Sequence, residues 1–103
     1  MAEGVYRITE DFEKMLCDYT GSPYAVAVDN CSNALFLCLM RENVAGKEIS
    51  IPSRTYPSVP CEIIHAGAKV NFLPIIGDTI KGAYRLSPTL IWDSALRFTA
   101  DMY

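Results

Sequence analysis

The chain has 103 residues, a length typical of a single domain, and half of its residues are hydrophobic, so a packed core is expected. The formal net charge is −3 and no cluster of Lys and Arg is present, which argues against nucleic acids and anionic membranes as partners. No apolar stretch reaches about 18 residues, and the N-terminus lacks the basic-then-apolar pattern of a signal peptide. The sequence therefore predicts a cytoplasmic protein without a membrane span.

The cysteines do not predict a metal site. Cys17, Cys31, Cys38 and Cys61 form no C-x-x-C pair, and the chain has one histidine, His65. Three of the cysteines lie in apolar stretches with helical character, which is typical of small core residues. Cys31 differs, because the start of a helix lowers the pKa of a thiol. We favour a packing role for Cys31 over a reactive one, and both interpretations stay open.

In chain order, the first predicted element is a helix over 9–20, in which apolar residues recur at helical spacing behind an acidic first turn. A Gly-Ser-Pro step then ends it. An apolar run predicts a first strand over 24–29, and strong helix formers predict a second helix over 32–43. This second helix is apolar on most of its circumference, so we expect it to be buried on more than one side.

The second half of the chain continues to alternate strands with helices. Its predicted elements are a strand over 48–52, a helix over 56–66, a strand over 69–73, a hairpin-like segment over 76–88 and a last strand over 89–93. Pro60 falls inside the helix of this series and would cost one hydrogen bond unless it lies in the first turn.

This alternation favours an α/β fold with a partial, mostly parallel sheet flanked by helices. We expect one partial domain over 1–103 with a βαβαβ core over 24–73. Ligands of such sheets bind outside the carboxyl ends of the strands. Three polar segments follow predicted strands at these ends: Asp29-Asn30, Ser53-Arg54-Thr55-Tyr56 and Asp93-Ser94. The sequence therefore predicts a ligand site at one rim of the sheet.

The junction between the predicted strand 24–29 and the helix 32–43 is a candidate anion site. The first N–H groups of a helix have no partner within it, and the positive end of the helix dipole points the same way. Ser32 can add a hydroxyl group to this cradle. An ordinary N-cap explains the same residues, so both interpretations remain.

The order and spacing of five segments resemble the N-terminal half of the large domain of DegT/StrS-type sugar aminotransferases, which are pyridoxal-phosphate (PLP) enzymes of fold type I. The segments are Phe-Glu … Tyr-Thr-Gly over 12–21, Ala-Val-Ala-Val-Asp-Asn-Cys-Ser-Asn-Ala-Leu over 25–35, Ile-Pro-Ser-Arg-Thr-Tyr over 51–56, Gly-Ala-Lys-Val-Asn-Phe over 67–72 and Ile-Trp-Asp-Ser-Ala over 91–95. Together they span about 85 residues. The resemblance implies a fragment of that fold.

The resemblance implies a PLP site in which Cys31 and Ser32, with Asn33 next, cradle the phosphate. It implies further that Tyr56 stacks on the pyridine ring and that Asp93 holds the ring nitrogen. The residue types suit these roles, because a carboxylate keeps the ring nitrogen protonated and an aromatic face holds a flat ring. Taken singly, Asp93 also fits a turn cap and Tyr56 a core aromatic residue.

The chain also departs from the family pattern. Cys31 replaces a glycine, Leu96 stands where the family has a Gln or His that reaches the cofactor, and the segment before Asp93 is too short for a βα unit. The family's Schiff-base lysine lies beyond Asp93, and no lysine of this chain is expected at the rim. The four lysines are Lys14, Lys47, Lys69 and Lys81. We therefore assign no catalytic residue.

The resemblance implies the N-terminal portion of a PLP-dependent aminotransferase, truncated or split, that acts on a keto-sugar nucleotide with glutamate as amino donor. The chain alone is predicted to be inactive. Its expected partners are a second copy of itself, since family members are dimers, or a complementary chain that carries the lysine. The alternative is a non-catalytic, degenerate PLP-fold domain that binds a phosphate-bearing ligand or a protein partner.

Overall fold

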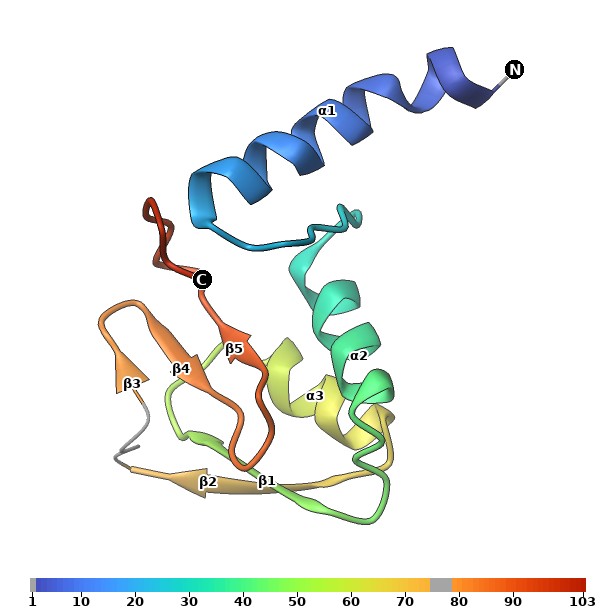
Figure 1. The fold of residues 1–103 in the computed structure, drawn as a ribbon. Coiled ribbons are helices and arrows are strands. Elements are labelled where there is room, and N and C mark those ends of the chain that lie inside the picture. The colour runs from blue at the N-terminus through green and yellow to red at the C-terminus, as the bar shows by residue number, and fades with distance from the viewer. Residues whose placement is uncertain (1, 75–78) are drawn as a thin grey trace. The chain divides into compact units, whose positions relative to one another are not determined.

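The computed structural model describes residues 2–74 and 79–103, and their elements are labelled in Figure 1. The chain forms two compact units. One combines Met1–Val28 with Phe98–Tyr103, and the other comprises Asp29–Arg97. None of the described helices is long and apolar enough to cross a membrane.

The first unit is built on helix α1 (Ala2–Thr20), which begins earlier than the predicted 9–20 and ends at the predicted residue. Gly21 follows it with a φ of 84° and donates its N–H to the carbonyl of Cys17 at 2.9 Å. This left-handed conformation is a common helix end and suits glycine. The C-terminal segment packs on the helix through Tyr19 and Phe98, whose rings are stacked with centroids 4.9 Å apart.

The predicted first strand over 24–29 is wrong, because the segment has no regular secondary structure. Val26 is 81% exposed, so the apolar run that predicted a strand is not covered within its unit. The N–H of Ala27 donates to the carboxylate of Glu13 at 2.7 Å instead of to a neighbouring strand. A strand needs a partner for its backbone groups, and among the described residues no strand pairs with this segment.

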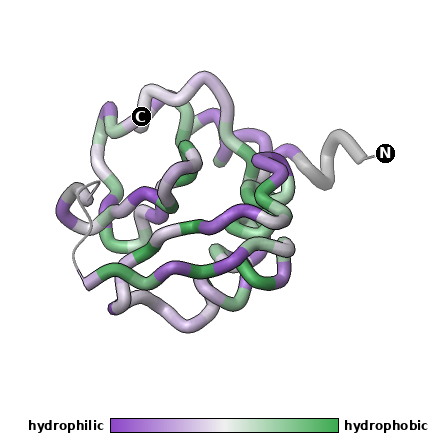
Figure 2. The backbone as a smooth tube through the Cα atoms, turned by 90° about the horizontal axis from the view of Figure 1, so that it is seen from below, coloured by the Kyte–Doolittle hydropathy of each residue, from purple (hydrophilic) through white to green (hydrophobic). Residues whose placement is uncertain are grey.

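The second unit contains a parallel pair of strands, β1 (Glu48–Pro52) and β2 (Lys69–Leu73), with the predicted bounds. Figure 2 shows hydrophobic and hydrophilic residues alternating along the two strands, which is the pattern of half-buried strands. Helix α3 (Ser58–His65) connects them, two residues shorter at its start and one shorter at its end than the predicted 56–66. Pro60 lies in its first turn, where the missing N–H has no partner to lose.

Helix α2 (Cys31–Arg41) packs beside α3 and contributes Leu35 and Leu39 to the core. The expectation of burial on more than one side is wrong for this unit, because Leu37 and Met40 are each more than half exposed. The described residues of the unit cover only the face of α2 that meets α3 and the strands. The core cluster comprises Leu35, Leu39, Val44, Ile49, Ile51, Val59, Ile63, Ala66, Ala68 and Leu86.

The last three strands form an antiparallel sheet in the order β3-β4-β5, comprising β3 (Thr79–Ile80), β4 (Ala83–Arg85) and β5 (Trp92–Asp93). The predicted hairpin-like segment over 76–88 is described from residue 79 onward, and there β3 and β4 form a hairpin. Residues 76–78 of that prediction lie outside the described residues. The predicted last strand over 89–93 is reduced to β5.

The prediction of a mostly parallel sheet is therefore corrected: among residues 2–74 and 79–103, two strands pair in parallel and three pair antiparallel. A two-residue turn joins β3 to β4, and a connection that short can only join antiparallel strands. An antiparallel bridge between Ser50 and Ser87 links the two sheets. In it each N–H donates to the other residue's carbonyl, at 2.8 and 3.2 Å.

Leu39→Ala should lower the free energy of unfolding by about 2–5 kcal/mol, because this fully buried side chain leaves a cavity behind it. Leu37→Ala on the same helix is the matched control, since Leu37 is 56% exposed; a change within about 0.5 kcal/mol is expected there. Urea unfolding followed by circular dichroism measures both values. Equal losses in the two variants would contradict this assignment of the core face of α2.

Candidate functional site

The second unit contains a cavity of about 1050 Å³. Its walls come from the start of α2, the end of β1 with the loop after it, the β3–β4 hairpin, and β5 with the residues that follow. Among the lining residues are Asn30, Cys31, Ser32, Arg54, Thr55, Tyr56, Gly82, Tyr84, Asp93 and Leu96. Four of the five predicted cofactor-binding residues thus lie around one cavity, and Asn33 does not.

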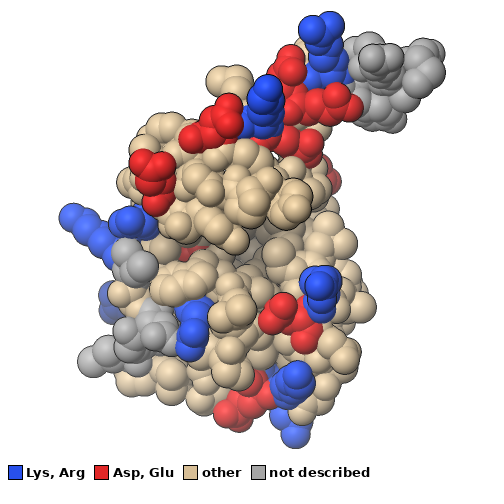
Figure 3. All heavy atoms as spheres, viewed as in Figure 1, with Lys and Arg blue, Asp and Glu red and all other residues tan. Residues whose placement is uncertain are grey.

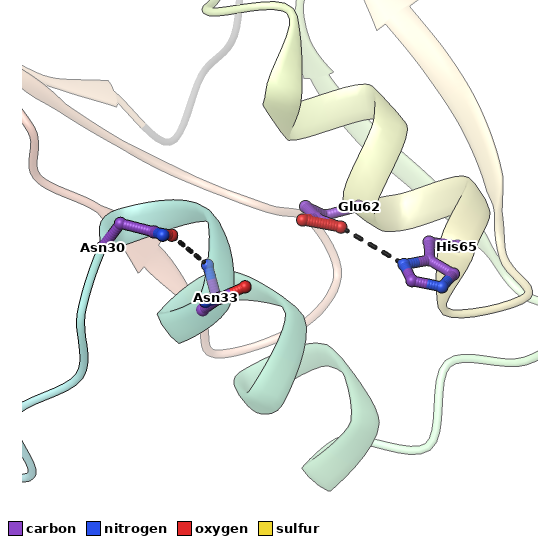
Figure 4. A network of polar contacts seen from close by, with 4 residues as sticks. All are labelled: Asn30, Asn33, Glu62 and His65. Carbon is purple, nitrogen blue, oxygen red and sulfur yellow. Dashed lines mark hydrogen bonds and ion pairs between the residues drawn. The ribbon is translucent and has the colours of Figure 1, made fainter.

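The start of α2 explains why Asn30 and not Asn33 faces the cavity. Asn30 is the N-cap, and its side-chain oxygen accepts a hydrogen bond from the N–H of Asn33 at 2.8 Å, as Figure 4 shows. The Asn33 side chain donates to Asp29 Oδ1 at 2.7 Å. The first backbone bond of the helix runs from Ala34 to the Asn30 carbonyl, so the N–H groups of Cys31 and Ser32 precede it. The predicted cap is therefore present, and two donors next to it lie at the cavity wall.

Tyr56 lies in the loop between β1 and α3 and is 75% exposed. This exposure rules out a core aromatic residue, which the sequence analysis gave as the alternative to a ring-stacking role for Tyr56. Its ring is accessible to a ligand. Arg54 in the same loop also lines the cavity and brings a positive charge to it.

Asp93 ends β5, and both of its carboxylate oxygens accept hydrogen bonds. Oδ1 accepts the N–H of Ala95 at 3.1 Å, which is the turn cap that the sequence left open. Oδ2 accepts the hydroxyl of Tyr84 at 3.2 Å. The carboxylate is therefore held by two donors, and it also lines the cavity.

Tyr84 is a cavity residue that sequence reasoning missed. It is 9% exposed, lies opposite Asp93 in the β4–β5 register, and its hydroxyl oxygen is 2.6 Å from Thr55 Oγ1. The pairing register of β4 with β5 is the signal that could have revealed Tyr84. Without the bounds of β4 and β5, the sequence gives no reason to place this tyrosine beside Asp93.

Burial and charge raise two pKa values in the cavity. Burial, the larger cause, and the Asp93 carboxylate raise the pKa of Tyr84 to about 12, against an opposing hydrogen bond from Thr55. Loss of solvent around the thiol, followed by the charges of Asp93 and Cys38, raises the pKa of Cys31. The raised pKa favours the neutral thiol over the reactive thiolate, and the exposure of Cys31 also does not fit a packed core residue.

The cavity lining includes no lysine, and each of the four lysines of the chain is exposed. Lys81, which belongs to the predicted hairpin-like segment over 76–88, lies in the turn between β3 and β4. Figure 3 shows Lys and Arg scattered over the visible face without forming a cluster. Within residues 2–74 and 79–103, no group of three His, Cys, Asp or Glu side chains could hold a metal ion.

Comparison with known proteins agrees with these features. The sequence profile of the DegT/DnrJ/EryC1/StrS aminotransferase family matches residues 3–89. The chain belongs to this family. The match includes the start of α2 and the loop after β1, but it ends before Asp93.

Curated relatives in the family are much longer than this chain. Spore coat polysaccharide biosynthesis protein SpsC of Bacillus subtilis is 36% identical over 72 residues, which cover 69% of this chain and 18% of that protein. GDP-perosamine synthase of Caulobacter vibrioides is 35% identical over 65 residues, covering 62% of this chain and 18% of the relative. A UDP-4-amino-4,6-dideoxy-N-acetyl-beta-L-altrosamine transaminase of Campylobacter jejuni is 29% identical over 84 residues, which cover 82% of this chain and 22% of that protein.

The chain thus spans about a fifth of the length of these aminotransferase-family relatives. No solved structure matches it. Family membership implies a fragment of PLP fold type I.

The raised pKa of Tyr84 predicts a pH dependence of stability. The unfolded chain has the ordinary value of 10.0, so the neutral phenol favours the folded state. This contribution is fully present below pH 10 and is lost as the pH rises toward about 12. Tyr84→Phe should therefore lose less stability over this interval than the unmodified chain.

Urea unfolding at a series of pH values between 9 and about 12 measures this difference. Tyr24→Phe is the matched control, because Tyr24 is 83% exposed and does not line the cavity; it should keep the pH dependence of the unmodified chain. Identical slopes for all three chains would contradict the assigned environment of Tyr84.

Proposed function

We propose that this chain is the N-terminal portion of a PLP-dependent aminotransferase that acts on a keto-sugar nucleotide, and that its cavity is the cofactor site. The observation that carries the proposal is the convergence of Cys31, Ser32, Tyr56 and Asp93 on one cavity in a member of this family. These residues come from three separate elements, so their convergence depends on the fold and not on proximity in sequence.

The cavity residues suit the chemical parts of PLP. The N–H groups of Cys31 and Ser32 at the start of α2, with the Ser32 hydroxyl, offer donors to a phosphate dianion. The exposed ring of Tyr56 offers a flat face to a pyridine ring. The carboxylate of Asp93 keeps lone pairs beyond the two that Tyr84 and Ala95 use, so it can accept a third donor from a ring N–H.

PLP, when bound, supplies an electron sink for chemistry at an amino group. In this site Asp93 would hold the proton on the ring nitrogen, since a nearby negative charge favours the charged form of the ring. The Schiff-base lysine has no counterpart among the cavity residues. We therefore propose that these residues bind the cofactor weakly by themselves and that the lysine comes from a part of the enzyme outside them, on the same polypeptide or on another chain.

The substrate class rests on the relatives. GDP-perosamine synthase and the altrosamine transaminase are named for nucleotide sugars, and each is similar to this chain over more than half of the chain's length. We propose a keto-sugar nucleotide as substrate and glutamate as amino donor of the whole enzyme. The proposed location is the cytoplasm.

Asp93→Asn should weaken PLP binding by about tenfold or more, because a hydrogen bond to a charged group is worth about 1.5–3 kcal/mol. The change keeps the shape and the acceptor for Ala95, so the free energy of unfolding should change by less than about 1 kcal/mol. Absorbance titration with PLP, with and without a candidate partner chain, measures the binding. Asp18→Asn on α1 is the control, since Asp18 is exposed and does not line the cavity.

Borohydride reduction followed by intact mass completes this test. We expect no stoichiometric adduct on Lys14, Lys47, Lys69 or Lys81 of the isolated chain. A site-specific adduct on one of them would contradict the assigned site. Absence of PLP binding in every mixture, with binding of another phosphate-bearing ligand retained, would favour the non-catalytic alternative.

We also propose that the chain associates with a second copy or with its complementary chain. Each unit leaves large apolar side chains exposed, namely Ile8, Phe12 and Met15 in the first and Leu37, Met40 and Ile64 in the second. Exposed apolar side chains at this density favour association, because burying them removes apolar surface from water. Light scattering should give a mass above that of one chain at micromolar concentration. A monomer mass across a wide concentration range would contradict this proposal.

A further inference from the structure

We propose that Tyr84 is a positioning residue, which fixes the Asp93 carboxylate and the loop carrying Tyr56 relative to each other so that the cavity selects an aromatic ring with a protonated nitrogen. The selectivity part rests on the proposed function, and the positioning part does not. Tyr84 lies in the hairpin, whereas Asp93 lies in β5 and Tyr56 follows β1. One phenol group therefore connects three elements.

The hydrogen bonds have a defined direction. A phenol has one hydrogen atom, and the Tyr84 hydroxyl donates it to Asp93 Oδ2 at 3.2 Å. The Thr55 hydroxyl, 2.6 Å from the phenol oxygen, must then donate to Tyr84. Thr55 immediately precedes Tyr56, so the chain of bonds begins at the loop that would stack on the ring and ends at the carboxylate that would hold the ring nitrogen.

The tyrosine itself is held firmly. It is 9% exposed and lies opposite Asp93 in the β4–β5 register. Gly82, two residues before it, accepts the N–H of Leu96 at 3.3 Å. A Cβ atom at Gly82 would lie 2.5 Å from the Leu96 carbonyl oxygen, so the hairpin turn approaches the segment after β5 as closely as a glycine allows.

The phenol leaves the charge of Asp93 intact. With a pKa raised to about 12, Tyr84 stays neutral at physiological pH and therefore adds no charge of either sign beside the carboxylate. Asp93 keeps its negative charge and unused lone pairs, in a fixed orientation, for a cationic ring N–H. A carboxylate that is already oriented costs a ligand less on binding than one that must be ordered. A lysine or arginine in place of Tyr84 would instead satisfy the charge of Asp93 itself.

Tyr84→Phe tests the selectivity, with PLP and an analogue that has carbon in place of the ring nitrogen as probes. We expect affinity for PLP to fall about fivefold or more and affinity for the analogue to stay within about twofold, because only PLP uses Asp93. In the double variant with Asp93→Asn, the loss should not exceed that of Asp93→Asn alone. Equal losses for both probes, or fully additive losses, would show a merely structural role and overturn the inference.

A ligand-free measurement tests the positioning part separately. Hydrogen exchange of the Ala95 amide reports on Asp93, because this N–H donates to Asp93 Oδ1. Tyr84→Phe should accelerate this exchange several-fold, while Tyr24→Phe should leave it unchanged, because Tyr24 is 83% exposed and does not line the cavity. Unchanged exchange in Tyr84→Phe, or equal acceleration in Tyr24→Phe, would overturn the positioning role. If neither probe binds to the unmodified chain, alone or with a candidate partner chain, the proposed function fails, and the exchange result still decides the role of Tyr84.

Discussion

The geometry of the cavity depends on the placement of one strand, β1. Its Ile49 and Ile51 are fully buried in the core, and its two edges are bonded to β2 on one side and to Ser87 on the other. Because both edges are bonded, the end of the strand cannot shift without breaking backbone hydrogen bonds. The loop after β1 carries Thr55 and Tyr56, so the position of the proposed ring-binding residue follows directly from the burial of two isoleucines.

The charged groups of the cavity come from different elements. The start of α2 offers backbone donors and a partial positive charge, and Arg54 adds a full one, whereas Asp93 supplies a negative charge from β5. A ligand that matches this pattern carries an anionic group at one end and a cationic or donating group at the other. The proposed cofactor, with a phosphate and a protonated ring nitrogen, has this distribution of charge.

Local sequence patterns predicted the local structure well. The bounds of β1 and β2 follow from apolar runs between turn residues, and the cap of α2 follows from the preference of Asn for that position. The predicted strand over 24–29 failed because a strand also needs a partner, and partners are set by distant residues. The resemblance named Asn33, but in the structure Asn30 lines the cavity, whereas the side chain of Asn33 donates to Asp29. The role of Tyr84 could not be predicted, because its contact with Asp93 depends on the pairing register of β4 with β5.

The hairpin that shortens the chain before Asp93 also changes the chemistry of the cavity. By the resemblance to the family, Leu96 replaces a polar side chain that reaches the cofactor, so the residue after β5 no longer contributes a hydrogen bond. The hairpin brings in a hydroxyl group from another element, and the two changes lie beside each other, since Gly82 of the hairpin contacts the Leu96 backbone. Asp93 is partly buried, and a carboxylate that is partly removed from water is costly to leave without hydrogen bonds. Tyr84 supplies one of the two hydrogen bonds that Asp93 accepts, and as a neutral donor it leaves the negative charge that the proposed cationic ring would use. The proposed cofactor site would therefore keep the contact of Asp93 with the ring nitrogen, while it would lack the contact that the resemblance assigns to position 96.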